Sequence, residues 1–510
     1  MPILGSLIQK GATFSAKKEL RKEPPFQAQQ KILSGLLKEA STTAFGRFYH
    51  FDKILESQDI IAAFQKSIPI FDYDKMHEEW WYRSLKNEAD VSWKEKPSYF
   101  ALSSGTTGGP SKFLPITKAM LKANNRIGLR MFLNFNSFDL DPTIYMKEKM
   151  MLGGSTDLID KGGYFIGDLS GINTSRLPSW IRISYRPGKA IAKIRDWNTR
   201  VTAIAQQAPN WDIGFIMGIP SWIQLMLEKV IKYNKVDNIH EIWPNLKVFI
   251  HGGIAFEPYK KGFEKLMGSP MIYIDTYLAS EGFIAYQTRP HAKGMKLILD
   301  KGIFYEFIPF NNDNFDAEGN PTALAKAVHI DQVEEGLDYA LLLSTCAGAW
   351  RYLIGDTVQF TDKTKSEIKI TGRTKHFLSV CGEHLSVDNM NLAIQATKEA
   401  LNIDIREFTV CAVPCDSSFK HKWYIGSLDS VDSETLKNCL DIHLKRLNDD
   451  YETERNAMLG MEVIPIPLRL FYQWHEAKGK LGGQSKFPRV MKNDQFEEWE
   501  NFVTKNWSNS

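Results

Sequence analysis

Long apolar runs, cysteines and a large excess of either charge are all scarce in this sequence. No stretch reaches the ~18 apolar residues that a membrane-spanning helix needs. Residues 1–22 lack the apolar core and cleavage site of a signal peptide. The net charge of +3 over 510 residues argues against nucleic acid binding as the main activity. We therefore expect a cytoplasmic protein with no membrane and no nucleic acid partner.

The sequence contains only five cysteines, an odd number that suits reduced thiols in the cytosol. Cys411 and Cys415 share one segment, but no second Cys/His pair with metal-ligand spacing accompanies them. We therefore expect no zinc site. Internal repeats and low-complexity tracts are also absent from the sequence.

The length of 510 residues exceeds one ordinary hydrophobic core, so we expect at least two domains. The composition, 43% hydrophobic and 24% charged, is typical of globular proteins. Buried strands are predicted near Trp211–Met217, Leu246–Ile250 and Met271–Asp275, and helical segments separate them. This alternation predicts a twisted, mostly parallel α/β sheet, in which ligands bind at the carboxyl ends of the strands.

The pattern changes after residue 295. From Lys296 to Val358 short strand-like segments separated by turns predict a distorted antiparallel subdomain. Beyond it we expect a small α+β domain, with strands near Glu407–Val413, Trp423–Gly426 and Ile464–Tyr472 and a helix over Ser433–Leu447. We place the domain boundary so that residues 1–371 form a large N-terminal domain and residues 372–510 a small C-terminal one.

One polar segment, Ser103-Ser104-Gly105-Thr106-Thr107-Gly108-Gly109-Pro110-Ser111-Lys112, follows a predicted strand and precedes a helix expected near Thr117. Its backbone N–H groups, hydroxyls and lysine suit a polyphosphate. A P-loop is excluded, because Pro110 and Ser111 stand where that motif needs Gly and Lys. A plain surface loop remains an alternative for this segment taken alone.

This segment, followed by Phe113-Leu114-Pro115, resembles the phosphate loop of the adenylate-forming superfamily, which includes acyl-CoA ligases, luciferases and the adenylation domains of peptide synthetases. It is most similar to the loop of the acyl acid–amido synthetases, the auxin-responsive Gretchen Hagen three family. The resemblance extends from about residue 27 to residue 489. It implies that Ser103, Ser104, Thr106, Thr107 and Lys112 contact the β- and γ-phosphates of ATP.

Two further segments resemble nucleotide-binding motifs of the superfamily. In Tyr277-Leu278-Ala279-Ser280-Glu281, the resemblance implies that Tyr277 stacks on adenine and that Ser280 contacts the nucleotide near its phosphates. Glu281 would hold Mg²⁺, which prefers oxygen ligands. Gly252 and Gly253 end a predicted strand that resembles the lining of the adenine pocket. Without the resemblance, a helix-capping Glu281 and a simple turn at the glycines are the alternatives.

The segment from Arg351 to Asp356 resembles the motif Tyr-Arg-x-Gly-Asp. Asp356 would accept hydrogen bonds from both ribose hydroxyls, as an ionised carboxylate is able to do. The sequence departs from the motif, since Leu353 follows the tyrosine and Arg351 precedes it. The role that the family gives to the arginine is therefore in doubt here.

Two late segments resemble the moving parts of the superfamily. Gly372-Arg373-Thr374-Lys375 is similar to the hinge, where Arg373 would reach the ribose or the phosphates and Lys375 would be the pivot. Gly482-Gly483-Gln484-Ser485-Lys486-Phe487-Pro488-Arg489 is similar to the ending of the amido synthetases, so Lys486 matches the lysine that enters the active site during adenylation. An exposed linker charge and a basic tail are the alternatives.

The resemblance implies an enzyme that uses ATP and Mg²⁺ to convert an acyl acid to an acyl-adenylate and then joins the acyl group to an amino acid. Two alternatives stay open. An acyl-CoA ligase would use a thiol acceptor, and Cys381-Gly382-Glu383 could face such an acceptor. A catalytically silent acyl-binding protein on the same scaffold is the other. The sequence identifies neither substrate nor the oligomeric state.

Overall fold

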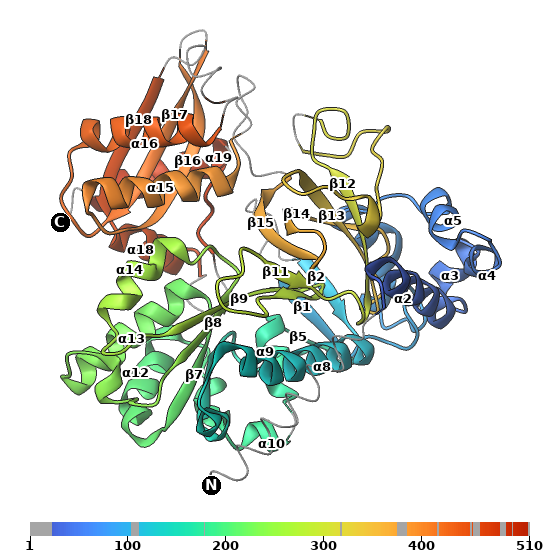
Figure 1. Ribbon diagram of the computed structural model, residues 1–510, viewed down its shortest axis with the longest axis horizontal. Coiled ribbons are helices and arrows are strands. Elements are labelled where there is room, and N and C mark those ends of the chain that lie inside the picture. Colours follow the sequence, from blue (N-terminus) through green and yellow to red (C-terminus); the bar gives the residue numbers. More distant parts are fainter. Residues whose placement is uncertain are drawn as a thin grey trace.

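The computed structural model describes residues 23–103, 112–177, 179–316, 319–374, 385–415, 418–448, 451, 460–479, 486–491 and 493–507. An N-terminal part carries two sheets and a C-terminal part carries a third. The two parts meet where α18 (Arg469–Ala477) lies beside α13 (Pro220–Asn234) and α14 (Glu257–Lys265) (Figure 1).

An 11-stranded sheet, in the order β12-β13-β14-β15-β11-β10-β9-β8-β7-β3-β6, organises the N-terminal part. It is parallel from β6 to β9 and antiparallel from β9 to β12. The predicted parallel sheet and antiparallel subdomain are thus confirmed, and they form one continuous sheet. Its strands are β3 (Glu148–Leu152), β6 (Tyr185–Arg186), β7 (Ile213–Gly218), β8 (Val248–Gly252), β9 (Ile272–Ala279), β10 (Gly282–Tyr286), β11 (Met295–Leu297), β12 (Ile303–Pro309), β13 (Asp338–Thr345), β14 (Tyr352–Asp362) and β15 (Glu367–Arg373).

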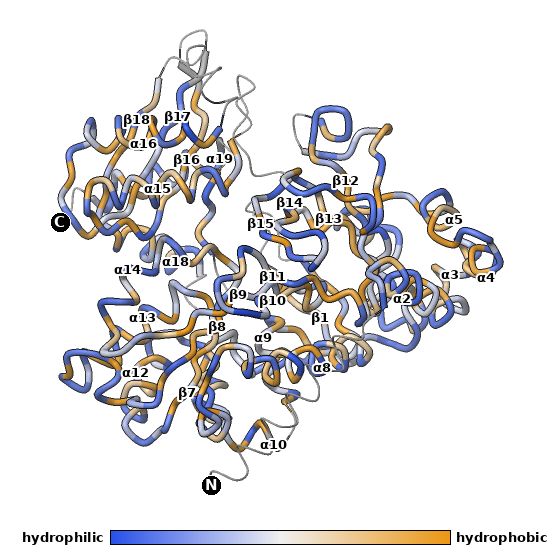
Figure 2. The backbone as a smooth tube through the Cα atoms, in the orientation of Figure 1, coloured by the Kyte–Doolittle hydropathy of each residue, from blue (hydrophilic) through white to orange (hydrophobic). Residues whose placement is uncertain are grey.

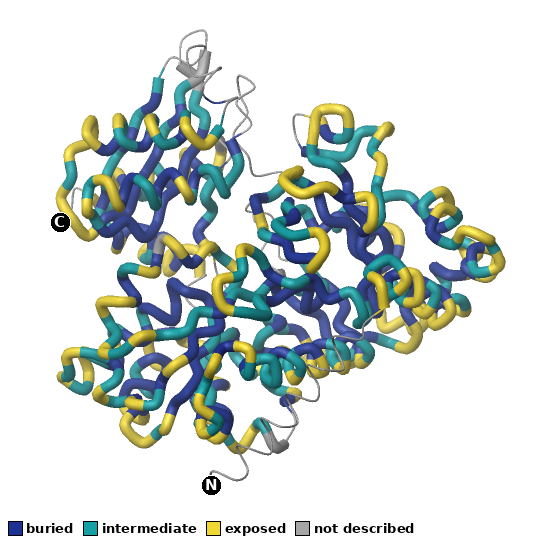
Figure 3. The backbone as a smooth tube through the Cα atoms, viewed as in Figure 1, coloured by how far each residue is buried: buried dark blue, intermediate teal, exposed yellow. Residues whose placement is uncertain are grey.

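Helices cover both faces of the parallel half. Side chains alternate across a strand, so Phe249 of β8 packs toward α12 (Trp197–Gln207), α13 and α14, whereas the next residue, Ile250, packs toward α8 (Lys118–Asn134). Pro220 opens α13, as its fixed φ allows. Figure 3 shows the strands of the sheet buried beneath these layers, with exposed residues on the outer surfaces and loops.

A small sheet and a group of N-terminal helices complete the N-terminal part. The helices pack on the antiparallel half in a core that buries Trp80, Trp81 and Trp93, so these tryptophans serve packing. The sheet has the order β2-β1-β5-β4, with β1 (Tyr99–Ser103), β2 (Lys112–Ile116), β4 (Ile159–Asp160) and β5 (Phe165–Gly167). The helices are α2 (Pro25–Ala40), α3 (Ala44–Phe48), α4 (Phe51–Leu55), α5 (Ile60–Ser67), α6 (Tyr73–Met76), the π-helix His77–Trp81 and α7 (Tyr82–Leu85), and α9 (Leu169–Ser175), α10 (Ser179–Arg182) and α11 (Lys189–Ala192) follow later.

The C-terminal part is the small α+β unit that the sequence predicts. Its sheet contains β16 (Ile405–Cys415), β17 (Ser418–Ser427) and β18 (Gly460–Pro467). Around the sheet lie α15 (Val387–Leu401), α16 (Ser433–Leu447), α18 and α19 (Asn493–Trp507) (Figure 1). Figure 2 shows hydrophobic and hydrophilic residues alternating along α15 and α16, as expected of helices that pack on one face.

The predicted strand near Ile464–Tyr472 is wrong in its second half. The strand β18 ends at Pro467, and α18 begins at Arg469. Leu470, Phe471 and Trp474 are buried at helical spacing, so the apolar run after Pro467 belongs to a helix. Short apolar runs fit either structure by periodicity alone, which explains the error. The boundary between residues 371 and 372 stays a prediction; β15 itself continues to Arg373.

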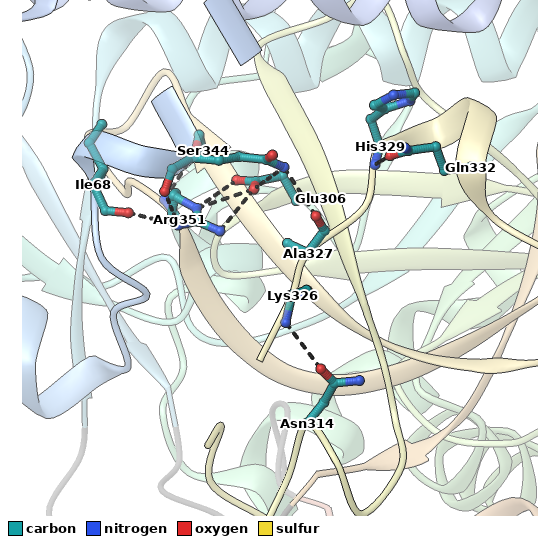
Figure 4. Close-up of polar contacts among 10 residues, drawn as sticks. Ile68, Glu306, Asn314, Lys326, Ala327, His329, Gln332, Ser344 and Arg351 are labelled. Carbon is teal, nitrogen blue, oxygen red and sulfur yellow. Dashed lines mark hydrogen bonds and ion pairs between the residues drawn. The ribbon is translucent and has the colours of Figure 1, made fainter. Parts of the chain in front are cut away.

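Arg351, the residue that departs from the expected motif, is a buried anchor. Its Nε lies 3.2 Å and 3.1 Å from the two carboxylate oxygens of Glu306 on β12. Its Nη1 donates to the carbonyl oxygens of Gln65, at 2.9 Å, and Ile68, at 2.7 Å (Figure 4). Gln65 Nε2 also donates to Glu306, at 3.0 Å. Arg351 therefore ties the end of α5 to the antiparallel half of the sheet.

We predict that Arg351→Met destabilises the protein by about 3–5 kcal/mol, because it leaves the buried Glu306 carboxylate without its cation. The measurement is the urea concentration at half-unfolding. The matched control is Lys118→Ala, whose ion pair with Glu95 is exposed on both sides and which we expect to cost less than about 1 kcal/mol. Arg351→Met combined with Glu306→Leu should recover part of the loss. An unchanged midpoint in Arg351→Met would contradict the anchoring role.

Candidate active site

The ends of the predicted phosphate loop are held together by two antiparallel strands. Ser103 at the end of β1 pairs with Lys112 at the start of β2. Ser104, Thr106 and Thr107 lie outside the described residues. Tyr73 of α6 supports the second end, since its hydroxyl accepts a hydrogen bond of 2.8 Å from Phe113 N and its ring centroid lies 5.2 Å from Lys112 Nζ. No sequence motif indicates this role for Tyr73.

Asp356 forms the centre of the candidate site. It lies opposite Arg373 in the antiparallel pairing of β14 and β15. Arg373 Nε lies 3.2 Å from Asp356 Oδ1, and the hydroxyl of Tyr277, on β9, donates a 2.5 Å hydrogen bond to Asp356 Oδ2. Tyr277 is only 5% exposed. Two predicted nucleotide-binding residues, Tyr277 and Arg373, therefore contact a third, Asp356, and the three lie on three different strands.

Glu281 lies at the tight turn between β9 and β10, where Ala279 pairs with Gly282. Burial raises the pKa of its carboxyl group to about 7, and the nearby negative charge of Asp356 adds to the shift. The positive charges of Arg373 and Lys112 act in the opposite direction. Glu281 is therefore a carboxylate whose surroundings do not fully balance its charge. Ser280 occupies the same turn, beside Glu281.

The two glycines after β8 permit close approach. A Cβ on Gly252 would lie 2.3 Å from the carbonyl oxygen of Thr276. Gly253 has φ +87°, in the left-handed region, and a Cβ there would lie 3.3 Å from Lys486 Cε. The bare backbone at Gly253 thus faces the lysine that the C-terminal part supplies.

Lys486 enters the site from the far end of the chain. Burial lowers the pKa of its amine, as does the positive charge of Arg373, whereas Asp356 and Glu281 act to raise it. The side chain is nevertheless exposed to solvent. Protein atoms therefore surround the lysine on several sides, while part of it remains in contact with water. The structure therefore brings Lys486, Glu281, Asp356 and Arg373 together. Lys375, the predicted pivot, lies outside the described residues.

Two polar residues beside the site had no predicted role. His251 of β8 pairs in register with Asp275 of β9, and His251 Nδ1 lies 3.5 Å from Asp275 Oδ1. Burial lowers the pKa of His251 to about 3 and raises the pKa of Asp275 to about 7, a shift to which Glu257 adds. The imidazole is thus neutral. The signal that could have identified them is a polar residue at the carboxyl end of two predicted strands, His251 after Leu246–Ile250 and Asp275 as the last residue of Met271–Asp275.

Neither a metal-binding cluster nor a membrane-spanning helix is found among the described residues. Within the described parts of the chain, no group of three or more His, Cys, Asp or Glu side chains is placed to hold a metal ion. None of the helices in those parts is long and apolar enough to span a membrane.

Comparison with known proteins places this arrangement in a class. Over 96% of the chain, the fold matches 95% of a solved structure described as GH3.15 acyl acid amido synthetase, with a TM-score of 0.76 and 16% identity. A 2-hydroxyisobutyryl-CoA ligase in its postadenylation state matches over 94% of this chain and 92% of its own, with a TM-score of 0.59 and 12% identity. The fold is that of the adenylate-forming enzymes.

Sequence comparison identifies the family within that class. The models of the GH3 family N-terminal, central and C-terminal domains match residues 16–204, 296–373 and 388–495, more than half of the chain. The chain belongs to the GH3 family, the family that its motifs resemble.

Curated relatives match over shorter stretches. Indole-3-acetic acid-amido synthetase GH3.2 of Arabidopsis thaliana is 27% identical over 31% of this chain and 30% of its own length. Jasmonoyl--L-amino acid synthetase GH3.5 of Oryza sativa subsp. japonica is 26% identical over 46% of this chain and 42% of its own. These alignments thus span less than half of each relative's length.

We predict that Glu281→Gln stabilises the ligand-free protein at high pH. The folded state raises this pKa from its usual 4.5 to about 7, so it binds the proton more tightly than the unfolded chain does. Wild-type stability therefore falls as pH rises through that interval, and the penalty is complete above it. At about pH 8.5 the variant should gain about 1–2 kcal/mol, less than the full shift because Glu281 is partly exposed.

The measurement is the difference in melting temperature between Glu281→Gln and wild type, without ATP or metal. This difference should shrink as the pH falls toward about 5, where wild-type Glu281 is also protonated. A difference that stays constant with pH would show that Glu281 carries no unbalanced charge.

Proposed function

We propose that this protein adenylates the carboxylate of an acyl acid with ATP and then transfers the acyl group to the amine of an amino acid. The observation that carries the proposal is the meeting of Lys486, from the C-terminal part, with Glu281, Asp356 and Arg373 at the strand ends of the N-terminal part. Membership of the GH3 family supports the amine as the acceptor.

The nucleotide would bind across the ends of β8, β9 and β14. Asp356 already accepts a hydrogen bond from Tyr277 and forms an ion pair with Arg373, and ribose hydroxyls would be further donors to the same carboxylate. Gly252 and Gly253 would line the adenine pocket with bare backbone, which permits close approach of Thr276 and Lys486. Lys112, next to the loop of Ser103, Ser104, Thr106 and Thr107, would contact the β- and γ-phosphates.

Glu281 is the residue that would hold Mg²⁺. Burial and the charge of Asp356 raise its pKa, and a bound cation would relieve both effects by balancing the carboxylate. Mg²⁺ commonly takes one or two protein carboxylates together with substrate phosphates and water, so a single glutamate suits it. Bound there, the ion would supply charge neutralisation on the phosphate oxygens.

Lys486 would act on the first step. A carboxylate oxygen of the acid attacks the α-phosphorus of ATP, the bond from that phosphorus to the bridging oxygen breaks, and pyrophosphate leaves. Two anions approach one another in this step, so a preorganised cation stabilises the transition state. Arg373, held by Asp356, would add a second positive charge near the ribose or phosphates.

The second step consumes the acyl-adenylate. The amine nitrogen attacks the acyl carbon, the bond from carbon to the phosphate oxygen breaks, AMP leaves and the nitrogen releases a proton. Lys486 has no role in this attack. We therefore propose that the C-terminal part turns about the segment that includes Lys375 between the two steps, so that the amine gains access.

We also infer that the enzyme works in the cytoplasm on small molecules. Cys346 and Cys439 are free thiols, which suits a reducing compartment. The small net charge of +3 likewise offers no general attraction for nucleic acid.

The test is ATP–pyrophosphate exchange with a library of acyl acids, followed by amino acids or coenzyme A as the acceptor. We expect exchange that depends on one class of acid and on Mg²⁺, and amide formation with an amino acid. Thioester formation alone would establish an acyl-CoA ligase instead. Absence of exchange with every acid, from protein that binds an acid, would identify a silent scaffold.

We predict that Lys486→Ala slows pyrophosphate exchange by about 100-fold or more, the scale of losing one preorganised charge-stabilising group. Amide formation from a preformed acyl-adenylate should be nearly unchanged. The control is Lys478→Ala. Lys478 directly follows α18 and forms an ion pair with Glu498. Equal slowing of both steps by Lys486→Ala would mean that the lysine supports the fold rather than the first step.

A further inference from the structure

A buried polar cluster joins the C-terminal part to α14. We define the clasp as Tyr259 of α14, Glu407 of β16 and Arg489. The hydroxyl of Tyr259 donates a 2.6 Å hydrogen bond to Glu407 Oε1 and lies 3.3 Å from Arg489 Nη2, which donates to it. Arg489 Nη1 donates to Glu407 Oε2 at 2.6 Å. Tyr259 is 1% exposed and Glu407 4%, so these groups are shielded from water.

A second polar contact crosses the same boundary. Arg406 of β16 donates from Nη1 to Glu228 Oε1 of α13 at 2.8 Å. Its Nε is held by Asp404 Oδ2 at 3.0 Å, so the guanidinium is fixed from within the C-terminal part. The pairs Tyr259–Glu407 and Glu228–Arg406 therefore connect neighbouring positions of β16 to two neighbouring helices of the N-terminal part (Figure 1).

The clasp is linked to Lys486 on both sides of the boundary. Arg489 follows Lys486 by three residues, and its strand-like segment is fixed to β16, because Val410 N donates to Arg489 O at 2.9 Å and Met491 N donates to Val410 O at 2.9 Å. On the other side, Gly253, which faces Lys486, is followed closely by α14 with Tyr259. Residues 253–259 of the N-terminal part and residues 486–489 of the C-terminal part thus provide both the contact of Gly253 with Lys486 and the contact of Tyr259 with Arg489.

We propose that the clasp positions Lys486 for adenylation and must open before the amine attacks. The inference rests on the proposed function, and it assigns Tyr259, Glu407 and Arg489 as positioning residues. Within the clasp only Tyr259 belongs to the N-terminal part. The ion pair of Glu407 with Arg489 lies inside the C-terminal part and survives when the two parts separate. Rotation of the C-terminal part therefore breaks the tyrosine's hydrogen bonds without leaving either charge unpaired.

This division makes Tyr259→Phe the decisive variant, because it removes only the hydrogen bonds that cross the boundary. Losing a hydrogen bond to a charged group changes an equilibrium constant by about 10- to 100-fold. We expect pyrophosphate exchange to fall about tenfold or more, while amide formation from a preformed acyl-adenylate stays unchanged or becomes faster. The matched control is Tyr424→Phe, which removes a 3.0 Å hydrogen bond from a tyrosine to Glu500 inside the C-terminal part.

Glu228→Gln tests the second crossing contact and should shift the two half-reactions in the same directions as Tyr259→Phe. Small-angle X-ray scattering supplies a readout besides activity: ligand-free Tyr259→Phe should contain more extended molecules than wild type or Tyr424→Phe. Normal exchange and unchanged scattering in Tyr259→Phe would overturn the clasp. Equal slowing of both half-reactions would overturn it too, since it would indicate a purely structural role.

The outcomes separate the clasp from the proposed function. If wild-type protein exchanges pyrophosphate but Tyr259→Phe matches it, only the clasp is wrong. If wild-type protein shows no exchange with any acid, the proposed function fails, and the scattering comparison still decides whether Tyr259 holds the two parts together. If Tyr259→Phe does not fold, Glu228→Gln carries both measurements.

Discussion

The balance between two carboxylates and two cations, gathered at a place that only partly exposes them to water, is the interaction on which this molecule depends. Glu281 and Asp356 supply the negative charges, and Arg373 and Lys486 supply the positive ones. Each comes from a different segment of the chain. An unpaired charge in such surroundings is costly, so the ends of β9, β14 and β15 must converge, and the C-terminal part must close over them to deliver Lys486.

The sequence predicted the members of this site better than it predicted their contacts. Asp356 and Arg373 were each assigned to the nucleotide, yet in the structure each is also the other's partner. Their pairing depends on the register of β14 against β15, which shifts at irregularities near Thr357 and Phe360. Such a register is set by packing across the whole sheet, and residue order alone does not contain it. The hydrogen bond from Tyr277 to Asp356 is of the same kind.

Two further cases show where a local sequence pattern does not determine the structure. Arg351 departs from the expected motif and the sequence offers no role for it; its partner Glu306 lies on β12, and the folded sheet brings the two together. The run from Leu468 to Tyr472 has apolar residues that fit a strand or a helix, and burial of Trp474 against α19 decides for the helix. By contrast, Pro220 marked the start of α13 correctly, because a fixed φ is a local property.

The nature of the contacts between the two parts fits a joint that must open and close. Exposing buried apolar surface to water costs about 25 cal/mol of free energy for each Å². An interface made only of apolar contacts would therefore oppose every opening. Here Tyr259 and Glu228 bridge to residues of β16 that keep a partner within the C-terminal part, Arg489 for Glu407 and Asp404 for Arg406. When the parts separate, Glu407 and Arg406 keep their partners within the C-terminal part, and Glu228 regains water. Trp222 also contacts Tyr472 and His475 across this boundary, at 6.3 Å and 6.1 Å between ring centroids, and the polar pairs add the specific geometry that orients the C-terminal part and Lys486.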